Sequence, residues 1–310
     1  MAEIKNESYF KRLGRNIVKH KAAYIMVLPV LIYYILFCYV PMYGTLMAFQ
    51  DYDPAWGILG SPWVGFSNFV DFFTGEYFFR LVKNTLTISI SSLVFGFPAP
   101  ILLALLINEF RSKKFVKTVQ TITYLPHFIS LVVVCAMIKN FVSADGIIGG
   151  IYSAFHNGDK TSMLMKPELF VPIYVISDIW QGVGWGSIIY FAALTGIDSE
   201  LYEACTIDGG GRLRQVFTVT LPGILPTIVI MLIMRIGGIL NVGYEKIILL
   251  YSPVTYKTAD VISSFVYRNG LQELNWSYGT AVGLFNSVIN IIFLLLANSI
   301  SKKVTETSLW

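Results

Sequence analysis

The stretch "EACTIDGGGRLRQVFTVTLPGILP", residues 203–226, is a polar, glycine-rich interruption between two long apolar runs. The 310-residue chain around it is 55% hydrophobic and only 14% charged, whereas a soluble domain carries about 25% charged residues. This composition predicts a membrane protein. An account of its function must therefore explain why so apolar a chain contains this polar stretch.

The start of the stretch has the pattern of a short helix with a defined beginning and end. Small or apolar residues recur at helical spacing, at Leu201, Ala204, Cys205 and Asp208. Asp198 or Ser199 can cap the first turn, where the helix dipole also favours Glu203. Gly209 follows where a left-handed C-cap is needed. We expect about two and a half helical turns.

The segment 212–219 can form a second short helix that returns to the membrane, with Pro222 or Pro226 in the first turn of the next span. A helix this short is marginal in water, so it either docks on a soluble partner or forms a cytoplasmic hairpin with a solvated face. Spacing alone leaves both interpretations open. A nucleotide-binding loop is excluded, because no Lys-Ser/Thr pair follows the glycines.

Six apolar segments are long enough to be transmembrane helices, since a bilayer core needs about 20 residues. They are 24–49, 84–108, 124–142, 171–194, 224–250 and 279–299. The third is the weakest, because Lys139 and Asn140 lie near its end. The predicted fold is an all-α membrane protein with six transmembrane helices. It has a cytoplasmic N-terminal segment (1–23), a transmembrane domain (24–300) that includes the loop 199–226, and a cytoplasmic tail (301–310).

Basic residues predict the orientation, since cytoplasmic flanks are enriched in Lys and Arg. Fourteen lie on the side that carries both termini and the loop 199–226, six lie on the other side, and three lie within spans. Both termini and the polar stretch are therefore predicted to be cytoplasmic. On the outer side, "GFSNFVDFF" (65–73) has aromatic residues at helical spacing and predicts a short interfacial helix.

The polar stretch also resembles a motif of the permease subunits of bacterial ABC importers. Their EAA loop, written EAA-x3-G, is followed at a fixed distance by an apolar residue and Leu-Pro. The matching residues are Glu203, Ala204, Cys205, Asp208, Gly209, Leu221 and Pro222. Cys205 replaces the second alanine of the motif. The resemblance covers about residues 24–300 and is strongest to the LplB-like branch of the MalF-type carbohydrate-uptake permeases.

The resemblance implies a non-catalytic permease subunit, with six spans and a cytoplasmic coupling helix, in a bacterial inner membrane. It implies a heterodimer with a second, homologous permease, two ATPase subunits, and an extracellular or periplasmic solute-binding protein. ATP and Mg would be held by the ATPases, and this chain would hold no cofactor. The implied cargo is an oligosaccharide or polysaccharide fragment, and no nucleic acid is expected. In the family, closure of the ATPases drives alternating access through the coupling helix.

A sugar pathway needs aromatic faces and hydrogen-bonding side chains around a cavity, and charges at membrane depth mark pathways. The candidates in the last three spans are Tyr174, Asp178, Gln181, Trp185, Arg235, Asn241, Tyr244, Glu245, Asn286 and Asn290. The alternative is hydrogen bonding between helices by the amides, with Arg235 paired to Asp178. The glycines of these spans favour close helix packing.

The charge of the cargo stays open at this point. Lys139, Arg235 and Lys246 suggest an anionic cargo such as a uronate oligosaccharide, yet Lys139 and Lys246 can also reach the outer interface from within a helix. A neutral oligosaccharide or a non-sugar solute are alternatives. A secondary transporter would need its own ion site and inverted repeats, and the halves show no clear repeat. A membrane enzyme lacks any GxSxG or HExxH motif or metal-site spacing of its cysteines and histidines.

Overall fold

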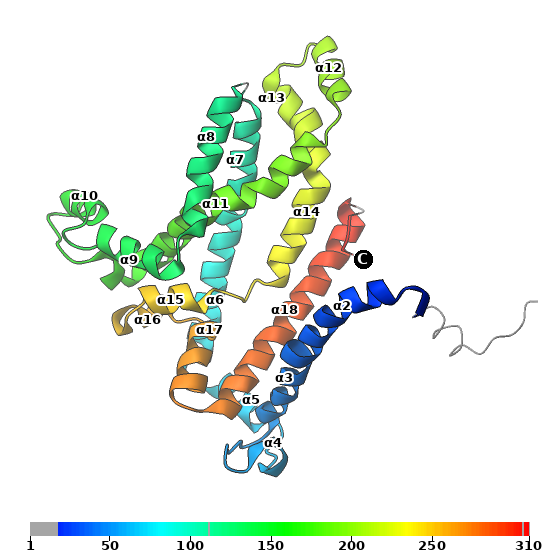
Figure 1. Cartoon of the computed structure of the whole chain (residues 1–310). Coiled ribbons are helices and arrows are strands. Elements are labelled where there is room, and N and C mark those ends of the chain that lie inside the picture. The colour runs from blue at the N-terminus through cyan, green and yellow to red at the C-terminus, as the bar shows by residue number, and fades with distance from the viewer. Residues whose placement is uncertain (1–17, 111, 306, 310) are drawn as a thin grey trace, which may run out of the picture.

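The computed structural model describes residues 18–110, 112–305 and 307–309. Most of the predicted N-terminal segment 1–23 lies outside the described residues. Helices dominate the described chain, and its one extended pairing is an isolated bridge between Gln50 and Trp63. The α12 helix lies at one end of the molecule, and α4 and α5 lie at the other (Figure 1).

Four helical stretches of the described residues are long and apolar enough to cross a membrane: Lys21–Phe49, Phe78–Asn108, Arg212–Gly237 and Trp276–Thr305. The first comprises α2 (Lys21–Tyr34), a π-turn (Ile35–Tyr39), α3 (Val40–Met42) and a 3-10 segment (Tyr43–Phe49). The second comprises α6 (Phe78–Ser91), a π-turn (Ser92–Gly96) and α7 (Pro98–Asn108). The third comprises α13 (Arg212–Gln215), a π-turn (Val216–Thr220) and α14 (Leu221–Gly237). The fourth is α18 (Trp276–Thr305).

Helix α11 (Pro167–Thr195) has 29 residues but is not among these four. Its length is sufficient to cross a bilayer, so its composition distinguishes it from the four stretches. Asp178, Gln181 and several glycines lower its mean hydropathy. Helix α11 is therefore long enough to span a bilayer but less apolar than the four stretches above.

The predicted third span, 124–142, is not one helix. Helix α8 (Lys113–Tyr124), a 3-10 turn (Leu125–Phe128) and α9 (Leu131–Phe141) form a pair bent by 100°. Pro126 lies in the 3-10 turn, Ile129 and Ser130 are extended, and the Ser130 hydroxyl accepts a hydrogen bond from Val133 N to start a new helix. Even as one bent unit, this pair makes at most a fifth crossing by length and composition among the described residues.

The predicted fifth span, 224–250, is also divided. Helix α14 ends at Gly237, residues 238–243 are not regular helix, and α15 (Tyr244–Leu250) follows as a separate piece. Glycine is a poor helix former, and Gly237, Gly238 and Gly243 bracket the break. The break places polar backbone at membrane depth, which is tolerated where the backbone is buried in protein or lines a cavity.

Three π-turns each lie directly before a proline at the start of the next α-helical piece. They end at Tyr39, Gly96 and Thr220 and precede Pro41, Pro98 and Pro222. Proline lacks an N–H and its ring clashes with the carbonyl four residues earlier, and the wider π-turn relieves this clash. The helices therefore continue through their prolines without a break.

The remaining short elements are connected to the ends of these helices. They are α4 (Gly57–Gly60), α5 (Ser67–Thr74), α10 (Ile147–Phe155), a 3-10 turn (Met163–Met165), α12 (Ser199–Ile207), a 3-10 turn (Pro253–Thr255), α16 (Tyr256–Ala259), α17 (Ile262–Phe265) and a π-turn (Val266–Gln272). The predicted aromatic helix is α5, and its Phe72 is buried against Phe78 and Phe285.

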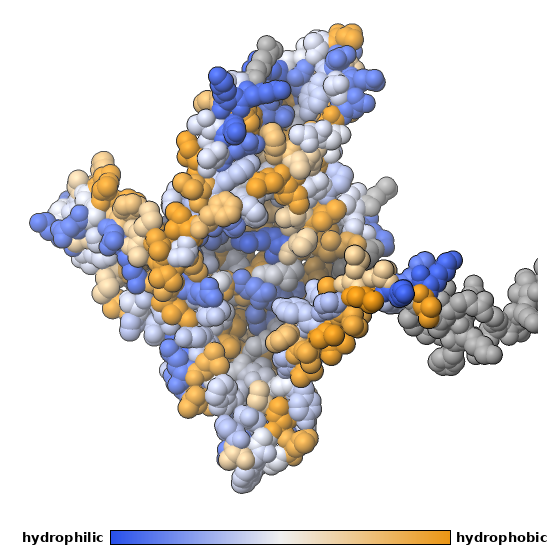
Figure 2. All heavy atoms as spheres, in the orientation of Figure 1, coloured by the Kyte–Doolittle hydropathy of each residue, from blue (hydrophilic) through white to orange (hydrophobic). Residues whose placement is uncertain are grey.

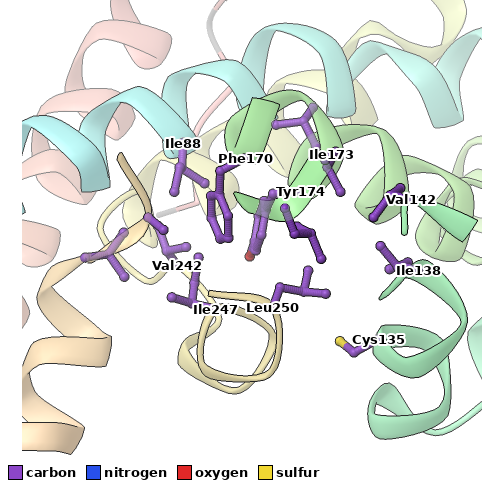
Figure 3. Close-up of a cluster of buried hydrophobic side chains, with 14 of the residues drawn as sticks. Ile88, Cys135, Ile138, Val142, Phe170, Ile173, Tyr174, Val242, Ile247 and Leu250 are labelled. Atoms are coloured by element: carbon purple, nitrogen blue, oxygen red, sulfur yellow. The ribbon is translucent and has the colours of Figure 1, made fainter. Parts of the chain in front are cut away.

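The largest apolar cluster joins α6, α9, α11 and α15. Ile88, Ile138, Phe170, Tyr174 and Ile247 meet within it (Figure 3). Hydrophobic surface covers α2 and the flanks of the molecule, and hydrophilic surface gathers at the end that carries α12 (Figure 2). The cluster fixes α15, and with it the break 238–243, against α11.

Candidate transport cavity and coupling loop

A cavity of about 340 Å³ lies where α6, α11, the break 238–243 and α15 meet. Its polar lining residues are Ser89, Ser92, Tyr174, Asp178, Gln181, Arg235, Asn241, Tyr244, Glu245 and Lys246. Seven of the ten predicted pathway residues are thus brought together. The break contributes to this, because in a continuous helix Arg235 and Asn241, six residues apart, would face directions about 120° apart.

An ion pair spans the cavity wall. Lys246 Nζ lies 3.3 Å from Asp178 Oδ1 and 3.3 Å from the Tyr174 carbonyl oxygen, and it sits over the Tyr174 ring at 4.7 Å. The Lys246 side chain is only 4% exposed, whereas that of Asp178 is 44% exposed. The lysine is thus the buried partner and the carboxylate faces the opening. Lys246 does not reach toward the outer interface, because its ammonium is held inside the protein.

Arg235 lies between this cavity and a second one. The second cavity, about 390 Å³, is bounded by α7, α11 and α14 and shares Asp178 and Arg235 with the first. The suggested pairing of Arg235 with Asp178 is not present, since the carboxylate pairs with Lys246 instead. Among the described residues Arg235 makes no ion pair. Its guanidinium is therefore a cation available to a ligand in either cavity.

The two asparagines of α18 form hydrogen bonds to residues 240 and 241 of the break. Asn286 Nδ2 and Asn290 Nδ2 donate to Asn241 Oδ1 at 3.1 and 2.9 Å. Asn290 Oδ1 accepts from Leu240 N at 3.1 Å. Neither side chain lines the cavity. Both asparagines therefore form the hydrogen bonds between helices that the alternative interpretation expects. They fix the side chain of Asn241, which itself lines the cavity.

Trp185 is not at the cavity, although it shares the stripe of Tyr174 on α11. It lies eleven residues further along, about 16 Å at 1.5 Å per residue. Its ring stacks on His127 at 4.6 Å and meets Phe128 edge-on at 5.8 Å. Helical spacing identified the correct face of α11 but not the correct depth. The tryptophan instead packs on the bend between α8 and α9.

Lys246, Ser89 and Ser92 are cavity residues outside the predicted pathway set. Lys246 could have been predicted from the sequence, because it is a lysine inside an apolar segment and its partner Asp178 was already a candidate. The sequence did not single out the two serines, because serines in a membrane helix more often form hydrogen bonds to the backbone of their own helix.

The predicted coupling loop has the expected local geometry. Helix α12 begins after Asp198, whose side chain accepts from Glu200 N at 3.0 Å. It ends at Ile207, and Gly209 directly after the cap residue Asp208 has a φ of +76°, the left-handed conformation expected of a glycine that terminates a helix. The segment 212–220 then returns as a helix that runs directly into α14. Pro222 lies in the first turn of α14, as predicted, although the helical stretch Arg212–Gly237 is continuous through it.

Side chains fasten α12 to this returning segment. Tyr202 Oη and Thr220 Oγ1 are 3.2 Å apart, and Gln215 Nε2 donates to Thr206 Oγ1 at 2.9 Å. Cys205 is half-buried in the corner, where Gly210 packs so closely that a Cβ there would lie 2.4 Å from its sulfur. The loop is a small rigid unit, and Glu203, Ala204 and Asp208 remain exposed on it.

Large apolar side chains are also exposed on this loop. Ile207 is 86% exposed, and Leu213 and Phe217 are exposed as well. Exposed apolar residues at a charged, predicted cytoplasmic surface indicate a protein-binding site. Among the described residues no group of three or more His, Cys, Asp or Glu could hold a metal ion.

Residues 96–306 match the family described as "Binding-protein-dependent transport system inner membrane component". The chain is 44% identical to the polygalacturonan/rhamnogalacturonan transport system permease protein YteP of Bacillus subtilis over 97% of this chain and 94% of that protein. It is 42% identical to protein LplB of the same organism over 94% of this chain and 92% of that protein.

A solved structure of a bacterial ABC transporter involved in import of the acidic polysaccharide alginate contains a similar chain. The TM-score is 0.87 at 46% identity, over 95% of this chain and 99% of that chain. A second structure, of a bacterial alginate ABC transporter in complex with an alginate pentasaccharide-bound periplasmic protein, matches with the same TM-score. The family match over residues 96–306 and these similarities show that the chain belongs to the family of binding-protein-dependent transport system inner membrane components.

Proposed function

We propose that this chain is a permease subunit of an ATP-driven importer and that it passes acidic oligosaccharides through the cavity beside α11. The cavity carries this proposal. Tyr174 and Tyr244 supply aromatic faces, Gln181 and Glu245 can bond to hydroxyls, and Arg235 is a cation with no acidic partner in the described chain.

The charge of the cargo follows from Arg235 and from the relatives. A guanidinium binds a carboxylate with two parallel hydrogen bonds and stays charged at all relevant pH values. The related transporters are named for polygalacturonan/rhamnogalacturonan and for alginate, which are acidic polysaccharides. These names support a uronate-containing cargo over a neutral one.

The test of the cargo compares an oligogalacturonate with a neutral oligosaccharide of the same length. With the complex in lipid nanodiscs, the binding protein loaded with the acidic sugar should stimulate ATP hydrolysis and the neutral sugar should not. Arg235→Gln should remove much of this difference without dissociating the complex. Equal stimulation by both sugars would exclude an acidic preference and leave the importer assignment intact.

We further propose that α12 is the coupling helix and inserts into a cleft of a partner ATPase. The complex would contain a second homologous permease, two ATPases that bind ATP and Mg, and a solute-binding protein. The rigid corner between α12 and α13, with Glu203 and Ile207 exposed on it, supports this role. No metal or nucleotide is assigned to this chain.

The test of coupling is Glu203→Lys. We expect weaker co-purification of the ATPase and lost uptake, with normal membrane insertion, because a cation would replace an anion at the docking surface. Lys302→Glu, a charge reversal of equal size on the exposed end of α18, is the control. Normal uptake by the Glu203→Lys variant would refute the coupling role. Uptake driven by an ion gradient alone would favour a secondary transporter instead.

A further inference from the structure

A third cavity with polar lining, of about 360 Å³, lies on a part of α6 that the candidate transport cavity does not use. Three cations line it: Arg80 and Lys83 from α6, and Lys257 from α16. Phe79, Asn84 and Thr258 stand beside them.

The two cavities open on opposite faces of α6. Residues 80, 83, 84 and 87 line the basic cavity, whereas 88, 89 and 92 line the transport cavity. At 100° per residue the centres of these two sets are separated by roughly 135°. A ligand in the basic cavity would therefore lie on the far side of the helix from the cargo.

The basic cavity has an excess of positive charge. Asp260, which is fully buried, is the one carboxylate bound to these cations, and Arg268 already holds it through bonds of 2.7 and 3.2 Å. Arg80 Nη2 reaches the same carboxylate at 3.2 Å. Lys83 and Lys257 are exposed and make no ion pair within the described chain. The cluster thus contains four cations and one carboxylate, and the two arginines are the cations that contact this carboxylate in the described chain.

The walls of the cavity are fixed and their neutral donors are already used. Asn84 Nδ2 donates to the Asp260 and Tyr256 carbonyl oxygens at 2.9 and 3.3 Å, and Thr258 Oγ1 donates to the Pro167 carbonyl oxygen at 2.6 Å. By contrast, Arg80 Nε is buried without a hydrogen-bond partner among the described residues. Such a donor costs free energy, and an anionic ligand can supply its acceptor.

The position of the cavity indicates which anion it binds. Lys83 is five residues, about 7 Å, into a span that begins at Phe78, so the cations lie near the level of lipid headgroups. Phe79, on the rim, is 80% exposed, as expected of an aromatic residue at the membrane interface. We propose that the cavity binds the phosphate of an anionic phospholipid. This proposal holds for either orientation of the chain in the membrane.

The test measures lipid affinity by native mass spectrometry of the complex released from nanodiscs of phosphatidylglycerol and phosphatidylcholine in equal amounts. The variant is Lys83→Gln with Lys257→Gln, which leaves Arg80 and its bond to Asp260 intact. The control is Lys139→Gln with Lys160→Gln, two exposed lysines outside the cavity. The native chain should prefer phosphatidylglycerol, and the variant should lose roughly thirty-fold in relative affinity, while the control keeps it.

Several results would overturn the proposal. Equal preference in the variant and the control would show that these lysines bind no lipid. Displacement of the lipid by excess inorganic phosphate would assign the cavity to a free anion. Unchanged lipid affinity together with weaker stimulation by the binding protein would make the cavity a protein contact. Because both lysines are exposed, thermal unfolding should be unchanged, which separates lost binding from lost folding.

Discussion

At the scale of single residues, the pair of Asp178 and Lys246 gives the transport cavity its character. The pair is asymmetric, because the lysine is almost fully enclosed and the aspartate is close to half exposed. A charge that water cannot reach depends on its partner much more than one that water can reach. The two residues should therefore respond differently to substitution.

We expect Asp178→Asn to lower the stability of the complex by about 1–3 kcal/mol, since it leaves a buried ammonium without its counter-charge. Lys246→Met should cost less, because water can solvate the remaining carboxylate. The double variant should recover most of the loss. Thermal unfolding of the four forms in nanodiscs measures this coupling, and strictly additive effects would show that the pair contributes nothing.

At the scale of elements, glycines determine how closely two helices pack and where a helix ends. A Cβ on Gly184 would lie 2.1 Å from the Thr123 carbonyl oxygen of α8, whereas a Cβ on Gly182 of the same helix would meet nothing within 4 Å. The prediction that these glycines serve close packing therefore holds for Gly184, while Gly182 and Gly238 line cavities instead.

Gly184→Ala should force α11 away from α8 and destabilise the protein by about 1–3 kcal/mol, as overpacking does. Gly182→Ala is the matched control and should be neutral or slightly stabilising, because alanine favours helix. Melting temperatures of both variants in nanodiscs measure the difference. Equal melting temperatures would contradict the close contact.

The end of α12 depends on Gly209 in the same way. Gly209→Ala should cost about 1–2 kcal/mol at its left-handed φ and so weaken retention of the ATPase during purification. Gly211→Ala is the control, because Gly211 has a φ of −78° and open space around it. Equal retention of the ATPase by both variants would argue against a strained C-cap.

At the scale of the whole molecule, the orientation in the membrane can be measured at the two ends of the fold. Ile207 of α12 is 86% exposed and Phe155 of α10 is 82% exposed, and the charge count places them on opposite sides. With native cysteines replaced, Phe155→Cys should react with an impermeant maleimide from outside, and Ile207→Cys only from inside. The reverse pattern would invert the predicted topology.

The local structure of the loop 199–226 was predicted almost completely from the sequence, because capping, helix length and the glycine stop are local properties. The sequence also identified seven cavity residues, because three of them share one face of α11 and the other four are polar or aromatic residues within an apolar segment. It did not predict the breaks at 125–130 and 238–243, because an apolar segment looks alike whether it is continuous or bent. Depth along a helix and ion-pair partners, as for Trp185 and Lys246, depend on packing between distant segments.

The three π-turns before Pro41, Pro98 and Pro222 have a consequence for insertions and deletions. Each π-turn holds one more residue than the α-helical turn it replaces. Deleting one residue within 92–96 would therefore leave an ordinary α-helical turn and keep α6 and α7 in register, whereas inserting one residue there would rotate α7 by about 100° relative to α6. Ile101 and Ala104, which pack on Tyr190 and Ile224, would then face away from their partners. These spans should therefore tolerate the loss of one residue in a π-turn far better than the gain of one.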